Sequence, residues 1–214
     1  MDDGFVKMWD NWSKKRSNIP VYDLWLDEYK DILQKNKENE IVDLGCGIGA
    51  DTLYLLERDY NVLSCDFSIE ALKIVHNNIP NSKTLYLDLM KTFPIVDNKY
   101  SLIIADLSLH YFNNDTTIHI MKEIKRILKV NGILLSRVAS VNDFNFGAGQ
   151  GEKLENNYYF EGDYTKRFFD LEDVNKYFGI IGNVETKETQ MIRSEEEYSK
   201  PKMLYKIKVE KNII

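Results

Sequence analysis

The stretch Ile41-Val42-Asp43-Leu44-Gly45-Cys46-Gly47-Ile48-Gly49 decides the fold. A short apolar strand carries Asp43 near its end and opens into three alternating glycines, and an amphipathic helix is predicted from Ala50 to Glu57. Glycines at a turn between a strand and a helix let the backbone approach a ligand where a Cβ would collide. Such a turn lies at the ligand-binding end of a doubly wound α/β sheet.

Two kinds of ligand suit this turn. Gly45-x-Gly47-x-x-Ala50 fits the dinucleotide fingerprint. Residues 43–49 also resemble, at every defined position, the motif D-x-G-x-G-x-G of class I S-adenosylmethionine-dependent methyltransferases. A carboxylate at Asp43 would repel a pyrophosphate but attract an ammonium and a sulfonium, so it favours the methyltransferase cofactor. A tight turn without any ligand is the remaining alternative.

Further landmarks follow in the order that this family has them. A second strand, Asn61–Cys65, leads into Asp66, which lies 21 positions past Gly45 and suits a carboxylate that accepts the ribose hydroxyls. That spacing serves a dinucleotide enzyme equally well. A third strand, Thr84–Leu87, precedes Asp88, where the resemblance implies a contact with the adenine amine. The alternative for Asp88 is a solvated strand end or a helix cap.

A continuous apolar run, Tyr100–Ala105, predicts a strand that is buried on both faces. The next stretch, Asp106–Phe112, resembles the fourth family motif, which lies near the transferable methyl group. Its Leu109-His110 pair is common in small-molecule methyltransferases of this type. The N-P-P-Y type of sequence is absent, which argues against methylation of nucleobase amines.

The resemblance implies a set of site residues. Cofactor binding is expected at Asp43, Gly45, Cys46, Gly47, Asp66, Phe67, Asp88, Leu89, Ala105 and Asp106. Substrate binding is expected at Tyr111, Tyr158 and Tyr159, and His110 is the candidate general base because its ordinary pKa lies near neutrality. A structural histidine is the alternative for His110. No metal is expected, because Asp106 lacks an Asp-Asn partner pair at the spacing of catechol-type methyltransferases.

The alternation of strands and helices predicts one α/β domain over residues 1–214, with a seven-stranded, mostly parallel sheet. Its parts are an N-terminal helical cap (1–36), a cofactor-binding core (37–140), a substrate lid (141–169), and a helix with a strand pair (170–214). The stretches around 184–192 and 203–209 predict the terminal antiparallel pair that is typical of class I methyltransferases.

Two segments decorate this core. Residues 1–36 carry three tryptophans and predict one or two amphipathic helices, which either cover the cofactor or pack only on the sheet. Residues 141–169 are rich in aromatics and glycine and predict a long loop that closes over the substrate, with a self-packed surface loop as the alternative.

Charge and composition narrow the partners. The formal net charge is −6, which disfavours nucleic acid as a general partner, because polyanion binders need a basic stripe. No stretch of the sequence reaches membrane-spanning length, and the acidic start is unlike a signal peptide. The two cysteines fit a reduced, cytoplasmic protein. A small-molecule substrate is expected, and the oligomeric state stays open.

These observations predict methyl transfer from S-adenosylmethionine to a small molecule. Within the superfamily the chain is similar to the tellurite-resistance and thiopurine type. A nicotinamide-dependent oxidoreductase is one alternative, although Asp43 and the terminal strand pair speak against it. A non-catalytic S-adenosylmethionine-binding regulator is the other.

Overall fold

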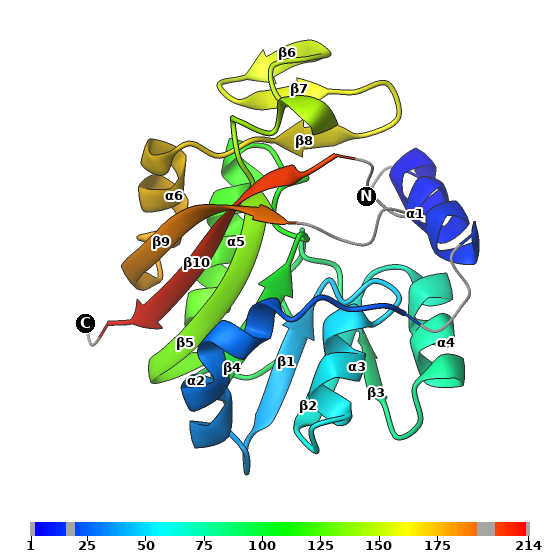
Figure 1. The fold of residues 1–214 in the computed structure, drawn as a ribbon, viewed down its shortest axis with the longest axis vertical. Coiled ribbons are helices and arrows are strands. Elements are labelled where there is room, and N and C mark those ends of the chain that lie inside the picture. The colour runs from blue at the N-terminus through cyan, green and yellow to red at the C-terminus, as the bar shows by residue number, and fades with distance from the viewer. Residues whose placement is uncertain (1–2, 16–19, 192–199, 213–214) are drawn as a thin grey trace.

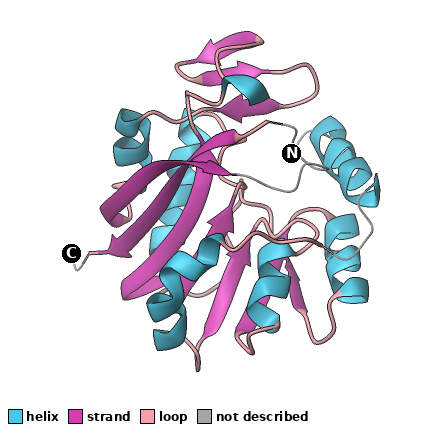
Figure 2. Ribbon diagram, in the orientation of Figure 1, coloured by secondary structure: helices cyan, strands magenta, loops and turns pink. Residues whose placement is uncertain are grey.

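The computed structural model describes residues 3–15, 20–191 and 200–212. Within these ranges, one sheet of seven strands forms the centre of the molecule, and helices cover both of its faces (Figures 1 and 2). Its strands are β1 (Glu40–Leu44), β2 (Asn61–Asp66), β3 (Lys83–Tyr86), β4 (Tyr100–Asp106), β5 (Leu128–Ala139), β9 (Gly182–Met191) and β10 (Lys202–Lys211).

The strand order is β3-β2-β1-β4-β5-β10-β9, so the chain starts in the middle and winds outward in both directions. Strands β1 to β5 run parallel, and β10 is antiparallel to both β5 and β9. The predicted seven-stranded sheet and its antiparallel strands near the C-terminus are therefore confirmed. This order places a switch point between β1 and β4, where ligands of doubly wound sheets bind.

The helices lie on both faces of the sheet. They are α1 (Asp3–Lys15), α2 (Lys30–Lys35), α3 (Ala50–Leu56), α4 (Ile69–Asn78), α5 (Asn114–Ile127) and α6 (Leu171–Phe178), with the 3-10 helices η1 (Trp25–Tyr29) and η2 (Phe144–Phe146). Val42 on β1 faces a core shared with α5 and α6, whereas its neighbour Ile41 faces a core shared with α2 and α3. Successive strand residues point to opposite faces, so one apolar strand supplies both cores.

Side-chain caps start the helices near the site. The Ser68 hydroxyl accepts the amide of Ala71 at the start of α4, and Asp170 caps α6 in the same way. Helix α5 begins after Asn113, whose side chain accepts the Thr116 amide.

The segment 141–169 does not form the long loop that the sequence predicts. It contains a separate sheet of three antiparallel strands, β6 (Glu152–Glu155), β7 (Tyr158–Phe160) and β8 (Thr165–Arg167). Asn157 takes a left-handed backbone conformation in the turn between β6 and β7, which asparagine tolerates well, and Gly162 does so between β7 and β8. Such short strands are not predicted from the sequence, because the prediction relies on longer runs of alternating polar and apolar residues.

The N-terminal segment lies across the opening of the large sheet. Helix α1 packs against α4, and the small sheet lies on the other side of α1 (Figure 1). The sequence also predicts a break between two N-terminal helices at Ile19-Pro20, and Ile19 lies outside the described ranges. In the part of the chain that the structure describes, no helix has the length and apolar character needed to cross a membrane.

Candidate functional site

A cavity of about 350 Å³ opens at the carboxyl ends of β1, β2 and β4. The glycine turn after β1 forms its floor on the sheet side, and α1 forms part of its cover. The cavity therefore lies at the switch point of the strand order, and it extends from the glycine turn to Tyr164 in the turn between β7 and β8.

The glycine turn is tight because a second loop touches it. Gly45 has a φ of 71°, and a Cβ there would lie 2.3 Å from the Cβ of Ser108 in the loop after β4. The Ser108 hydroxyl donates to the carbonyl of Leu44 at 2.7 Å and fixes this contact. Gly47 has a φ of 53°, and a Cβ there would meet no atom within 4 Å, so its backbone faces open space.

Asp66 at the end of β2 holds the glycine turn from the side. Its carboxylate accepts the amides of Gly47 at 2.9 Å and Ser68 at 2.8 Å. Ser68 in turn donates its hydroxyl to Asp10 of α1. The predicted ribose-binding carboxylate is thus linked to both the glycine turn and the helix that covers the cavity, and it lines the cavity as expected.

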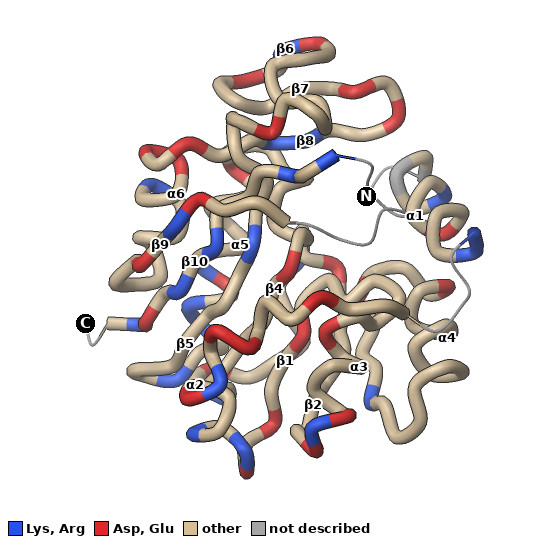
Figure 3. The backbone as a smooth tube through the Cα atoms, viewed as in Figure 1, with Lys and Arg blue, Asp and Glu red and all other residues tan. Residues whose placement is uncertain are grey.

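Two further carboxylates lie against neutral donors at this end. Asp43 of β1 accepts the hydroxyl of Thr52 at 2.8 Å, and Asp51 of α3 accepts the indole N–H of Trp25 at 3.0 Å. Burial, opposed in part by the Thr52 hydrogen bond and helped by nearby carboxylates, raises the pKa of Asp43 to about 7. Burial likewise raises the pKa of Asp51 well above its usual range. Figure 3 shows acidic positions in red among the strands and turns that border the cavity.

Arg137 of β5 is the buried cation of this region, and the sequence reasoning missed it. Its guanidinium donates two bonds to Asp106, at 2.6 and 2.7 Å, and a third to Asp23 at 2.7 Å. The group also lies 4.7 Å from the ring of Trp25. An arginine within the otherwise apolar run 133–138 was the available signal. The pairing explains how Asp106 is held at the cavity wall.

The far end of the cavity is aromatic. The rings of Trp9 and Tyr111 meet edge to face with centroids 4.9 Å apart, and Tyr111 meets Tyr164 at 6.1 Å. Trp12 and Phe112 also line this end, together with Lys202. These side chains come from α1, the loop after β4, the β7–β8 hairpin and β10. Of the two alternatives for the N-terminal segment, the structure favours coverage of the cavity, through Trp9 and Trp12 of α1 and the bond between Ser68 and Asp10.

His110 does not line this cavity. It is fully buried, and its Nδ1 accepts the backbone amide of Ala139 at 3.3 Å, while its Nε2 has no partner among the described residues. Burial, with the nearby charges of Lys166 and Lys202, lowers its pKa well below the usual range. A neutral imidazole in this setting carries its proton on Nε2. This position favours the structural alternative for His110.

The other predicted site residues divide in two. Gly45, Cys46, Phe67 and Leu89 line the cavity, as do Asp43, Gly47, Asp66, Asp106 and Tyr111. Four do not: Asp88, Ala105, Tyr158 and Tyr159. Asp88 caps the turn after β3 by accepting the Met90 amide at 2.9 Å, and the Tyr158 hydroxyl donates to Thr165 at 2.7 Å. Tyr164, which the sequence reasoning did not assign, lies in the cavity instead.

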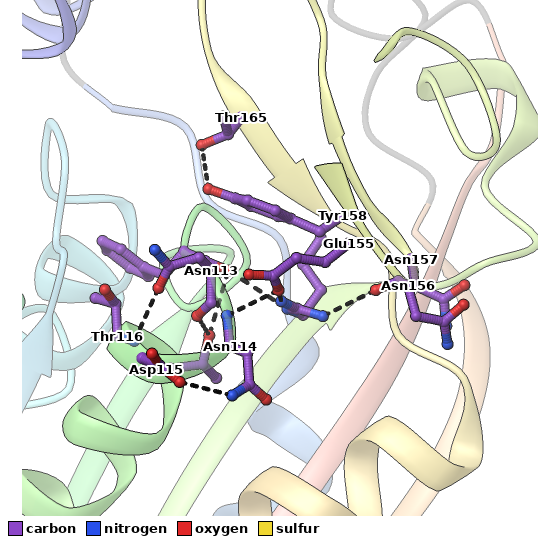
Figure 4. A network of polar contacts seen from close by, with 12 residues as sticks. Asn113, Asn114, Asp115, Thr116, Glu155, Asn156, Asn157, Tyr158 and Thr165 are labelled. Carbon is purple, nitrogen blue, oxygen red and sulfur yellow. Dashed lines mark hydrogen bonds and ion pairs between the residues drawn. The ribbon is translucent and has the colours of Figure 1, made fainter. Parts of the chain in front are cut away.

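The small sheet is anchored next to the cavity by Arg167, which is 2% exposed. Its guanidinium binds Glu155 and the backbone carbonyls of Phe112 and Asn156. Glu155 also accepts the amide of Asn114 at 2.9 Å at the start of α5 (Figure 4). These bonds fix the three strands to the loop that follows β4.

The described residues contain no group of three or more His, Cys, Asp or Glu placed to hold a metal ion. The polar groups of the cavity are instead carboxylates and backbone amides around an open glycine turn. They fit a nucleoside that carries positive charge, since Asp66 can meet ribose hydroxyls and the remaining carboxylates can meet cations.

The sequence matches the family described as "Methyltransferase domain" over residues 41–132, which include the glycine turn and the loop after β4. This match covers 92 of the 214 residues, and over them the chain is similar to class I S-adenosylmethionine-dependent methyltransferases. S-adenosylmethionine is accordingly the cofactor that this similarity implies.

The curated proteins that this chain resembles are distant in sequence. It is 28% identical to the tRNA N(3)-cytidine methyltransferase METTL2 of Bos taurus, over 62% of this chain and 38% of that protein. It is 22% identical to the glycine/sarcosine N-methyltransferase of Aphanothece halophytica, over 77% and 62%. It is 30% identical to the putative methyltransferase YqeM of Bacillus subtilis, over 64% and 55%. The chain thus spans less than two thirds of the length of these relatives.

Solved structures share the fold over most of the chain. A methyltransferase from Methanosarcina mazei matches with a TM-score of 0.68 at 16% identity, over 82% of this chain and 93% of that one. A methyltransferase from Anabaena variabilis matches with a TM-score of 0.65 at 17% identity, over 99% and 96%. The second match includes the regions outside the conserved core.

Proposed function

We propose that this protein transfers the methyl group of S-adenosylmethionine to a small-molecule acceptor. The observation that carries the proposal is one cavity with two chemically different ends, a glycine turn with carboxylates at one end and aromatic rings at the other. The first end suits the cofactor of the superfamily. The second end suits a compact, partly apolar molecule, because α1 and the small sheet border it.

In this reaction the main task of the protein is to align the acceptor's nucleophile with the methyl group. The sulfonium of the bound cofactor supplies an activated methyl group with a good leaving group. Asp66 binds the ribose, Asp43 and Asp51 face the positive charge, and Trp9, Tyr111 and Tyr164 confine the acceptor. Holding the nucleophile in line with the methyl group provides much of the rate enhancement in such a transfer.

No histidine lines the acceptor end of the cavity among the described residues. An acceptor that is already a good nucleophile at neutral pH, such as a thiolate or an unprotonated amine, therefore suits this end best, because it needs no general base. The buried, neutral His110 supports a packing role next to Tyr111, with ring centroids 4.5 Å apart.

The METTL2 relatives make tRNA the second candidate for the acceptor, although the chain covers only 38% of the bovine protein. The net charge of −6 gives no support to a polyanion partner. The covered, aromatic end of the cavity also favours an acceptor smaller than a polynucleotide.

Formation of S-adenosylhomocysteine tests the proposal. The purified protein is incubated with S-adenosylmethionine and either a cell extract fraction below about 1 kDa or total tRNA. We expect turnover with the small-molecule fraction and none with tRNA. Turnover with tRNA alone would overturn the small-molecule acceptor, and failure to bind S-adenosylmethionine would overturn the activity as a whole. A matched control replaces Asp66 by alanine, which should suppress turnover with either fraction.

A further inference from the structure

A second cavity, of about 820 Å³, adjoins the aromatic end of the first. Met8, Trp12 and Tyr164 line both cavities, so the two meet at these side chains. The second cavity lies between α1 and the β7–β8 hairpin, and we call it the outer groove. A molecule whose reactive end lies beside the cofactor can therefore extend past Trp12 and Tyr164 into this groove.

The outer groove combines apolar rings with ammonium groups. One wall is a single face of α1, because its lining positions recur every three or four residues: Gly4, Lys7, Met8, Asn11, Trp12 and Lys15. The hairpin supplies the other wall with Phe160, Asp163 and Tyr164. Trp12 and Phe160 are 37% and 38% exposed, so large apolar side chains are open to a ligand here.

The charges on this side of the molecule differ in sign from those around the glycine turn. The charged residues that line the cofactor end are all aspartates, whereas Lys7 and Lys15 outnumber Asp163 in the outer groove. Lys202 of β10 adds another ammonium group at the aromatic end of the first cavity. This local positive charge is unusual in a chain with a net charge of −6. Within residues 3–15, 20–191 and 200–212, neither Lys7 nor Lys15 has an ion-pair partner that already neutralises it.

We propose that the methyl acceptor is an amphipathic anion. Its nucleophile and apolar body lie in the first cavity, and a single acid group, such as a carboxylate, lies beside Lys7 and Lys15 in the outer groove. This inference rests on the proposed function, since it names the chemical class of that acceptor. Two lysines beside one aspartate suit one acid group, whereas the repeated phosphates of a polynucleotide need a longer basic stripe.

The expected preference for an anion is modest because the groove is open to solvent. Lys7, Lys15 and Asp163 are exposed, so water and salt screen their charges. Exposed ion pairs contribute little each, and we therefore expect about a fivefold preference for an acid over a neutral molecule of the same shape. The rings between the two cavities bind the apolar body of either molecule alike. A comparison of matched molecules thus isolates the contribution of the acid group.

Binding of matched probes to the full chain, saturated with S-adenosylhomocysteine, tests this. The probes 6-phenylhexanoate, 6-phenylhexan-1-ol and 6-phenylhexylamine share a ring and a linker and carry a negative, a neutral and a positive end. Tryptophan fluorescence reports their binding, because Trp9 and Trp12 line the cavities. We expect the acid to bind about fivefold more tightly than the alcohol and the amine to bind most weakly. Addition of about 0.5 M salt should reduce this preference to less than about twofold.

Substitutions on α1 locate the acid group. Lys7→Gln combined with Lys15→Gln should bring the preference for the acid below about twofold. The matched control is Lys14→Gln combined with Lys129→Gln, which removes the same charge at exposed positions that line neither cavity. The charge of Lys14 acts on α4 instead. The control should keep the preference, and Asp163→Asn should raise it by about twofold.

Equal binding of the acid and the alcohol by the wild type would overturn the inference, as would the failure of all the probes to bind or a loss of the preference in the control. If Lys202→Gln removes the preference and the variant at Lys7 and Lys15 keeps it, the acid group lies in the first cavity and the outer groove is not its site. Displacement of 6-phenylhexanoate by total tRNA would assign the groove to a polynucleotide instead. The proposed function fails separately if S-adenosylhomocysteine itself does not bind, which is measured before any probe is added.

Discussion

The two ends of the cavity are built in different ways. At the cofactor end, carboxylates and backbone amides sit at the ends of adjacent strands and are held by directional hydrogen bonds, such as those of Asp66 to Gly47 and Ser68. At the acceptor end, Trp9, Tyr111 and Tyr164 arrive from segments far apart in the sequence and meet through ring contacts. The end proposed to bind the cofactor is polar and built from residues close in sequence, and the end proposed to bind the acceptor is apolar and assembled by tertiary folding.

The largest expected effect concerns the ion cluster behind the cofactor end. Replacing Arg137 by methionine leaves Asp106 and Asp23, whose side chains are 13% and 19% exposed, without their cation, which costs about 3 kcal/mol of folding free energy, the lower end of the range for breaking a buried pair. Urea denaturation monitored by circular dichroism measures this loss. The control is Lys83→Met, which removes an exposed pair with Glu40 and should cost less than about 1 kcal/mol. Equal losses in the two variants would mean that Arg137 is no more than a surface charge.

A smaller but still large effect is expected for cofactor binding. Asp66→Ala removes the carboxylate expected to accept the ribose hydroxyls, and it should weaken S-adenosylmethionine at least about tenfold by calorimetry. Asp88→Ala serves as the comparison, because Asp88 caps a turn and does not line the cavity. We expect its effect to stay below about threefold. A larger loss for Asp88→Ala would restore the adenine contact that the family resemblance implies for that residue.

At the aromatic end, the effect should fall on the acceptor alone. Tyr164→Ala opens the cavity wall and should raise the KM for the acceptor roughly fivefold, with the dissociation constant of S-adenosylmethionine nearly unchanged. Tyr159→Ala is the matched variant, since this ring packs against Phe168 outside the cavity. A loss of cofactor affinity in Tyr164→Ala would show that the two ends are not separate.

The smallest effect is expected at His110. Its pKa is held well below the usual range by burial, so it stays neutral between pH 6 and 8 and provides no acidic limb near pH 6.5 in the rate profile. His110→Asn keeps an acceptor for the Ala139 amide and should change turnover less than about threefold. Loss of an acidic limb in this variant would return His110 to the role of general base.

The same variant also has a signature in stability. Because folding lowers the pKa of His110, the unfolded chain binds the proton more readily, and this residue destabilises the protein as the pH falls below about 6.5. His110→Asn should therefore reduce the drop in melting temperature between pH 7.5 and pH 5.5. A drop equal to that of the wild type would indicate that the imidazole can reach solvent.

The contrast between the two ends also explains what the sequence could predict. The strand that ends at Asp43, the glycine turn and Asp66 lie within one βαβ unit, where local patterns and spacing carry the information. Tyr164 and Trp9 could not be paired with Tyr111 in this way, because nothing local links residues that are more than 50 or 100 positions apart. Arg137 was missed for the same reason, since its partners Asp23 and Asp106 lie on other elements.

The prediction of a long loop over 141–169 was wrong because the strands in this segment are very short. Strands of three or four residues contain too few alternating positions to stand out, and Tyr158 and Tyr159 point to opposite faces of such a strand. Neither tyrosine lines the cavity, whereas Tyr164 in the following turn does. The aromatic content of the segment drew attention to it, but which of its rings lines the cavity depends on the register of the hairpin.

The clamp formed by Arg167 has a consequence for the order in which reactants come and go. Opening the small sheet would break the buried Arg167 guanidinium from Glu155 and two carbonyls, whereas the links described between α1 and the site are the Ser68–Asp10 hydrogen bond and ring contacts. If the reactants pass on the α1 side, an acceptor held against Trp9 and Tyr111 would block the path to the glycine turn. Initial-rate kinetics should then follow a compulsory sequence, with S-adenosylmethionine first to arrive and S-adenosylhomocysteine last to depart.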